Sequence, residues 1–98
     1  MYFVTVMTYE HLHWTEGNTG RSRCVGFFQY FSNANEAVLT NLDNIHESEY
    51  DYVVIEEIRQ EGIYPWVDAS CWYQWINGRY QRIEQPIEAK HLTNFCLG

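Results

Sequence analysis

Residues 71–83 read Cys-Trp-Tyr-Gln-Trp-Ile-Asn-Gly-Arg-Tyr-Gln-Arg-Ile, and this stretch decides the fold. Its centre, Asn77-Gly78, lies between two runs rich in aromatic residues. Asn-Gly is the preferred two-residue loop of a type I′ hairpin, because both central residues must adopt positive φ. Such a turn also fixes the register of the two strands. Outward from the turn, the predicted cross-strand pairs are Ile76 with Arg79, Trp75 with Tyr80, Gln74 with Gln81, Tyr73 with Arg82, and Trp72 with Ile83.

Three more segments are predicted as strands, because β-branched and aromatic residues suit a pleated, half-buried surface. They are residues 2–9, 21–30 and 50–58. The first two are joined by a polar loop over residues 11–20, and we expect them to pair antiparallel. Gly26, inside the second of these strands, indicates a bulge or a close approach of another backbone.

One principal helix is predicted between the second and third strands. Asn33 can cap its N-terminus with Glu36 as the capping-box partner, and Ser32 is the other candidate cap. Apolar residues at helical spacing are expected to face the sheet: Ala34, Ala37, Val38, Leu42 and Ile45. The helix should end near residues 44–46.

The resulting order is ββαβββ, which predicts an α+β fold: a mainly antiparallel sheet with one principal helix packed on it, forming a single domain over residues 1–98. Residues 61–66 form a loop broken by glycine and proline. Near the C-terminus, we expect one or two helical turns over residues 87–92 and a final edge strand over residues 94–97. One helix covers only one face of the sheet, so the other face is either open to water or closed by a second copy of the chain in a homodimer. The high aromatic content favours closure.

The formal charge of −7 lies entirely in the middle of the chain. Residues 1–31 and 64–98 each sum to zero, whereas residues 36–61 carry eight carboxylates and one arginine. A phosphate-backbone binder needs a basic stripe, so direct nucleic-acid binding is not expected. The distribution favours a basic protein partner, although a merely solvated acidic surface is the alternative. The predicted partner-binding residues are Glu47, Glu49, Asp51, Glu56 and Glu57.

A second binding mode is suggested by two arginines and two aromatic rings. Arg21 and Arg23 share one strand face, and Tyr73 and Trp75 share one face of the hairpin. Arginines and stacked rings together can hold a nucleotide in a pocket. Alternatively, the two arginines form ion pairs with the surplus carboxylates.

No catalytic or metal-binding constellation is recognisable. His11 and His13 would share a face if their segment were extended, but zinc sites use paired ligands such as CxxC with HxxxH. Three cysteines without a CxxC spacing favour reduced thiols in a cytosol. The N-terminus has neither the basic region nor the apolar run of a signal peptide, and no stretch is long enough to cross a membrane. We therefore expect a cytoplasmic protein without enzymatic activity, metal or cofactor.

Several segments resemble a group of small uncharacterised proteins from gut Firmicutes, their phages and mobile elements. They are Arg-Ser-Arg-Cys-Val-Gly at 21–26, Glu-Ala at 36–37, Tyr-Asp-Tyr-Val-Val-Ile-Glu-Glu at 50–57, Gly-Ile-Tyr-Pro at 62–65, Trp-Tyr-Gln-Trp at 72–75 and Asn-Phe-Cys-Leu-Gly at 94–98. The likeness spans most of the chain and brings no catalytic residue with it. It implies a mobile-element context, in which short acidic proteins often disarm host defence.

Two functions follow from that context as expectations. The first is an anti-CRISPR-like inhibitor that binds a basic, nucleic-acid-handling host defence protein through the acidic surface. The second is a protein that sequesters an immune signalling nucleotide through the arginines and rings. Both act in the cytoplasm of a host bacterial cell.

Overall fold

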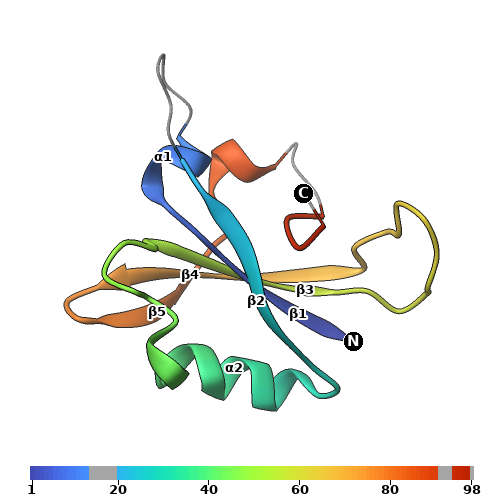
Figure 1. Cartoon of the computed structure of the whole chain (residues 1–98). Helices are drawn as coiled ribbons and strands as arrows, with labels where there is room; N and C mark the ends of the chain where they lie inside the picture. Colours follow the sequence, from blue (N-terminus) through green and yellow to red (C-terminus); the bar gives the residue numbers. More distant parts are fainter. Residues whose placement is uncertain (14–19, 91–93, 98) are drawn as a thin grey trace.

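The computed structural model describes residues 1–13, 20–90 and 94–97 (Figure 1). At its centre is a five-stranded antiparallel sheet with the spatial order β2-β1-β3-β4-β5. The strands are β1 (Tyr2–Met7), β2 (Ser22–Phe28), β3 (Tyr52–Glu57), β4 (Ala69–Ile76) and β5 (Arg79–Ile83). The helices are α1 (Tyr9–Leu12), α2 (Phe31–Leu39) and the short 3₁₀ segments η1 (Leu42–Asn44) and η2 (Ile87–Ala89). The predicted α+β class, with one principal helix on an antiparallel sheet, is confirmed.

The β4–β5 hairpin has the register that its turn predicts. All five expected pairs are present, from Ile76 opposite Arg79 to Trp72 opposite Ile83. Asn77 has φ of 53° and Gly78 has φ of 82°, so both turn residues occupy the positive-φ region that a type I′ loop requires.

The pairing of β1 with β2 is antiparallel, as predicted, and it contains a bulge. Val4 lies opposite Gly26 while the next residue, Thr5, lies opposite Cys24, so Val25 is the extra residue. The irregularity predicted from Gly26 is therefore found beside it.

Helix α2 begins earlier and ends earlier than its sequence predicts. Tyr30 occupies the N-cap position without a side-chain hydrogen bond, so neither Ser32 nor Asn33 caps the helix. The Phe31 ring packs edge-on against Tyr2 at 5.8 Å, which draws the first turn onto the sheet.

The helix ends at Leu39 because an asparagine redirects the chain just beyond it. Asn41 has φ of 50°, and its Oδ1 accepts a hydrogen bond from the backbone N–H of His46 at 3.0 Å. Asparagine side chains compete in this way with continuation of a helix. The predicted apolar stripe is accordingly buried at Ala34, Ala37 and Val38, whereas Leu42 is half exposed.

The sheet is covered on both faces by the chain itself (Figure 1). Helix α2 covers the face that carries Val53 and Tyr73. The opposite face, called here the second face, buries Val54 and Trp72 beneath residues contributed by α1, η2 and residues 94–97. The expectation that the chain itself leaves this face uncovered was therefore wrong, because α1, η2 and residues 94–97 lie on it. A homodimer stays a prediction.

Two local predictions change, because the segments concerned pack on the second face. The first strand stops at Met7, and α1 takes the place of the predicted end of that strand and of the start of the loop predicted over residues 11–20. Residues 14–19 of that loop lie outside the described residues. Residues 94–97 form a turn packed on the second face rather than an edge strand. The helical turn predicted after Pro86 is present as η2, and residues 91–93 lie outside the described residues.

Candidate functional site

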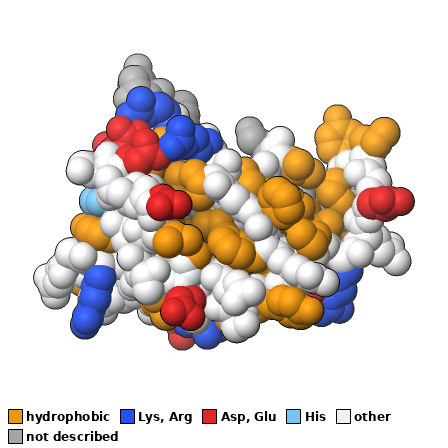
Figure 2. Space-filling view, turned by 60° about the horizontal axis from the view of Figure 1, so that its bottom comes forward, with side chains coloured by type: hydrophobic (Ala, Val, Ile, Leu, Met, Phe, Trp, Pro, Cys, Tyr) orange, Lys and Arg blue, Asp and Glu red, His pale blue; other side chains and the backbone are white. Residues whose placement is uncertain are grey.

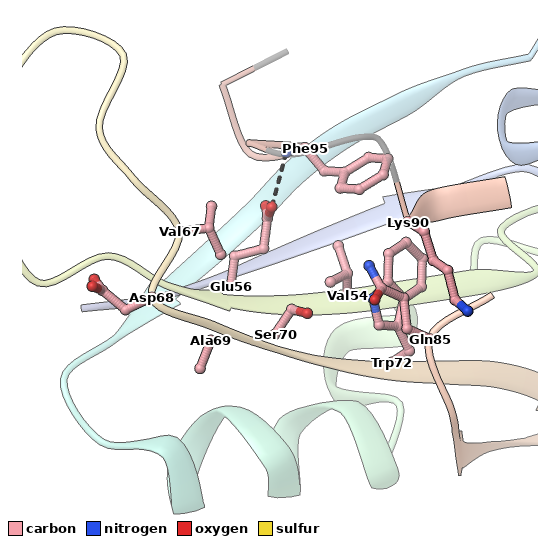
Figure 3. Close-up of a pocket in the computed structure, with 10 residues that line it drawn as sticks. All are labelled: Val54, Glu56, Val67, Asp68, Ala69, Ser70, Trp72, Gln85, Lys90 and Phe95. Atoms are coloured by element: carbon pink, nitrogen blue, oxygen red, sulfur yellow. Dashed lines mark hydrogen bonds between the residues drawn. The ribbon is translucent and has the colours of Figure 1, made fainter. Parts of the chain in front are cut away.

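The five carboxylates predicted to form one acidic surface occupy three different places. Glu56 is 2% exposed, and its Oε2 and Oε1 accept hydrogen bonds from the backbone N–H groups of Phe95 (3.0 Å) and Cys96 (2.9 Å). Figure 3 shows the Glu56 carboxylate directed toward Phe95. The assignment of Glu56 to a partner-binding surface was therefore wrong. Strand alternation places this side chain on the second face, where it binds the C-terminal segment instead.

Glu57 points to the opposite face and belongs to the end of β3. Its two oxygens accept hydrogen bonds from Nη2 and Nε of Arg59, at 3.1 and 3.2 Å. This guanidinium holds the pKa of the Glu57 carboxyl below its usual range, while the hydrogen bond to Glu57 raises the pKa of Tyr2. Glu57 thus carries an ion pair of its own, separate from the other predicted residues.

The remaining three carboxylates gather before the start of β3. Glu47 forms an ion pair with Arg23, and Glu49 forms one with Arg21 at 2.6 Å. Asp51 accepts a hydrogen bond from the backbone N–H of Tyr9 at 3.0 Å. The alternative interpretation of the two arginines, that they pair with the surplus carboxylates, is confirmed.

These contacts surround a recess at the junction of α1, β2 and the segment that leads into β3. Its lining residues are Thr8, Glu10, Arg21, Ser48, Glu49 and Asp51. We call it the acidic recess, because three carboxylates line it against one arginine. No group of three or more metal-ligating side chains is gathered in residues 1–13, 20–90 and 94–97. The recess is instead suited to receive the cationic end of a lysine or arginine side chain.

Glu10 is the member of the acidic recess that sequence reasoning missed. It is exposed, and within the described part of the chain it has no ion-pair partner. The sequence placed it after the end of a predicted strand, and α1 brings it beside Asp51, more than forty residues away in the chain. No local sequence pattern predicts that Glu10 lies near Asp51, because their proximity depends on the antiparallel pairing of β1 with β3.

The residues predicted to form a nucleotide pocket do not assemble into one. Tyr73 has no exposed surface, and its hydroxyl donates a hydrogen bond to Oδ1 of Asn35 at 2.5 Å. Trp75 stacks flat on His46, with ring centroids 3.8 Å apart. Burial raises the pKa of Tyr73 and lowers the pKa of His46, as expected of side chains packed into the structure.

His13 takes part in a chain of hydrogen-bonding groups on the second face. Its Nδ1 lies 3.2 Å from Oε2 of Glu88, and its Nε2 lies 3.0 Å from the hydroxyl of Tyr52. A carboxylate, an imidazole and a hydroxyl in sequence resemble the arrangement that activates a nucleophile. Tyr52 is buried, however, so its hydroxyl is shielded from any substrate. The chain of contacts therefore anchors α1 and η2 to β3.

A small pocket lies on the second face beside Glu56 (Figure 3). It has a volume of about 230 Å³, and its lining combines the apolar side chains of Val54, Trp72 and Phe95 with polar ones such as Glu56 and Lys90. The Trp72 ring packs edge-on against Phe95 at 5.2 Å. Burial, and to a smaller extent the charge of Glu56, raises the pKa of the neighbouring Cys96 thiol to about 12. Cys96 is therefore a poor nucleophile.

No protein family, curated protein or solved structure matches this chain. Among the described residues, no helix is long and apolar enough to cross a membrane.

Proposed function

We propose that this chain is a non-catalytic binding protein of a phage or mobile element, and that it inhibits a host antiviral defence protein by binding a basic surface of that protein. The observation that carries the proposal is the acidic recess. It places Glu10 and Asp51 beside Glu49. Arg21, the one arginine of the recess, forms its ion pair with Glu49.

The electrostatics of the whole chain favour the same class of partner. A net charge of −7 on 98 residues attracts a basic surface and accelerates its association. A defence effector that handles nucleic acid must present cationic side chains to phosphates, so its binding groove is such a surface. The recess would receive one of those side chains, and the effector would lose access to its nucleic acid in the cytoplasm of the host cell.

Sequestration of a signalling nucleotide is the other function that the sequence suggests. Its four residues are occupied by other contacts, since both arginines pair with carboxylates, Tyr73 is buried and Trp75 stacks on His46. No observation on the described residues favours it, and the proposal therefore rests on the acidic recess.

The test is a charge reversal at Glu10, which is exposed and makes no ion pair in the described part of the chain. We expect the parent protein to block target cleavage by at least one member of a panel of purified CRISPR effector nucleases. Glu10→Lys should weaken binding to that effector by about tenfold or more, equivalent to about 1.4 kcal/mol. Biolayer interferometry gives the affinity, and gel-resolved cleavage gives the inhibition.

The matched control is Glu36→Lys, which makes the same charge change at an exposed position on α2. It should leave both affinity and inhibition close to those of the parent. If both variants bind equally well, or if both weaken binding to the same degree, the acidic recess does not recognise the partner. If no effector of the panel is bound, the proposed target class is wrong.

A further inference from the structure

The loop between β3 and β4 carries three large apolar side chains into solvent. Ile63, Tyr64 and Trp66 are 91%, 90% and 88% exposed, the highest values among the large apolar residues that the structure describes. We call these three residues the apolar finger. Figure 2 shows a hydrophobic projection at its upper right, at the end of the molecule where the β3–β4 loop extends in Figure 1. Exposed large side chains gathered in this way mark interaction sites.

The base of this loop is held in place by hydrogen bonds on both sides. The N-terminal ammonium of Met1 donates to the carbonyl of Ile58 at 3.0 Å, and the Ile58 N–H donates to the carbonyl of Met1 at 2.9 Å. Across the loop, the Asp68 N–H donates to the carbonyl of Glu57 at 2.8 Å, and the Arg59 N–H donates to Oδ2 of Asp68 at 2.9 Å. These bonds restrict the base of the loop, which lowers the entropy lost when a partner binds.

The backbone at the tip adopts conformations that cost free energy. Tyr64 has φ of 52° and directly precedes Pro65, although a residue before proline is normally confined to extended conformations. Strained backbone of this kind clusters at sites that bind ligands, where it positions the side chains.

The charges beside the apolar finger discriminate between the surfaces that could cover it. The segment 57–68 contains Glu57, Glu61 and Asp68 against Arg59, and Arg59 is already paired with Glu57. An anionic membrane would be repelled, since interfacial anchors combine apolar residues with lysine and arginine. A second copy of the chain would bring a further charge of −7 and the same acidic segment.

We propose that the apolar finger inserts into an apolar pocket of a protein partner whose rim carries lysine or arginine. Tyrosine and tryptophan are the residues most enriched among the anchors of protein interfaces, and here they flank a proline that restricts the tip. Glu61, exposed beside the tip, would face the basic rim. The apolar finger and the acidic recess lie at opposite ends of β3: the finger comes after Glu57, and the recess is lined by residues just before Tyr52. The proposal for the finger therefore does not depend on the function proposed for the recess.

The test is photo-crosslinking in cells that produce the protein, with p-benzoylphenylalanine replacing Tyr64. The same probe replacing Glu36, on α2, is the matched control. We expect the Tyr64 probe alone to yield an adduct with another protein. Its crosslinked peptide, identified by mass spectrometry, should lie in an apolar pocket flanked by lysine or arginine.

Two further variants separate recognition from folding. The double variant Ile63→Ser/Trp66→Ser should unfold at the same temperature as the parent, because both side chains are exposed, and yet should abolish the adduct. Glu61→Lys should reduce the yield of the adduct in the same cells at least about threefold, because it reverses the charge that faces the basic rim. An adduct that survives both changes would contradict the proposal.

Other outcomes would also overturn it. An adduct between two copies of the chain would identify a self-association surface. Co-sedimentation of the parent, but not of Ile63→Ser/Trp66→Ser, with phosphatidylglycerol vesicles would identify a membrane surface. An equal yield from the Tyr64 and Glu36 probes, or no adduct with either, would show that the finger has no protein partner.

Discussion

Glu56 is one of eight carboxylates in the acidic middle of the chain, yet its side chain lies beneath the C-terminal segment. Burial of a charge is tolerated when hydrogen bonds replace those lost from water. The N–H groups of Phe95 and Cys96 supply such bonds, and Glu56 supplies the acceptors that these two groups would otherwise lack. The contact therefore holds residues 94–97 on the second face. A glutamate in a charged run can thus be structural, and its residue type does not reveal which role it has.

We predict that removing the Glu56 carboxylate destabilises the protein. Glu56→Ala leaves two backbone donors without an acceptor, and a lost partner of this kind costs about 1–3 kcal/mol for each buried group. We expect the free energy of unfolding in urea to fall by about 2–4 kcal/mol, which is less than the cost of two fully buried donors because the Cys96 N–H is only partly buried. The control, Glu84→Ala, removes an exposed carboxylate and should change stability by less than about 0.5 kcal/mol. Equal small losses in both variants would show that Glu56 does not hold the C-terminal segment.

At the scale of elements, the β4–β5 hairpin and helix α2 show different degrees of local control. The hairpin forms as its turn residues predict, because a type I′ loop needs positive φ at two adjacent residues and so fixes the register of both strands. Helix α2 follows its apolar stripe only as far as Leu39. Beyond that residue, the Asn41 side chain accepts a hydrogen bond from the backbone of His46, and the chain turns. Glu47 thereby reaches Arg23 of β2, and Glu49 reaches Arg21, which directly precedes β2.

We predict that the β4–β5 turn depends on the positive φ of Gly78. Gly78 has φ of 82° and nothing within 4 Å of the position that a new Cβ would occupy, so Gly78→Ala isolates the backbone cost. We expect a loss of about 1–2 kcal/mol in the free energy of unfolding, the usual cost of an L-residue at positive φ. Gly26→Ala is the control, because its nearest neighbour is Cε2 of Phe28 at 3.9 Å and its φ is not positive. The same loss at both glycines would rule out positive φ as the cause.

At the scale of the whole molecule, a net charge of −7 opposes compaction, while exposed ion pairs oppose unfolding. The pairs Arg21–Glu49 and Arg23–Glu47 are largely solvent-exposed, and such pairs contribute about 0–1 kcal/mol each. Repulsion among the unbalanced carboxylates extends over the molecule, and we expect it to outweigh two pairs of this kind. The same net negative charge that favours a basic partner therefore also lowers the free energy of unfolding.

Salt should reveal which of the two effects is larger. Raising NaCl from about 0.01 M to about 0.15 M shortens the Debye length from about 30 Å to about 8 Å, and so screens the repulsion. We expect the unfolding temperature at pH 7 to rise, as followed by circular dichroism. Near the isoelectric pH of about 4.9 the same salt should have little effect, because the net charge is close to zero. A fall in unfolding temperature at pH 7 would mean that the ion pairs dominate.

The sequence by itself determined the local elements of this protein: the hairpin and its register, the bulge near Gly26, and the buried stripe of α2. Turn chemistry and the spacing of apolar residues depend on neighbours along the chain, so they can be recognised in the sequence alone. Only the tertiary structure decided what covers the second face and which carboxylates remain exposed. It buried Glu56, paired Arg21 and Arg23, and brought Glu10 beside Asp51. Those contacts join residues that are distant in the chain, and only the packed sheet brings them together.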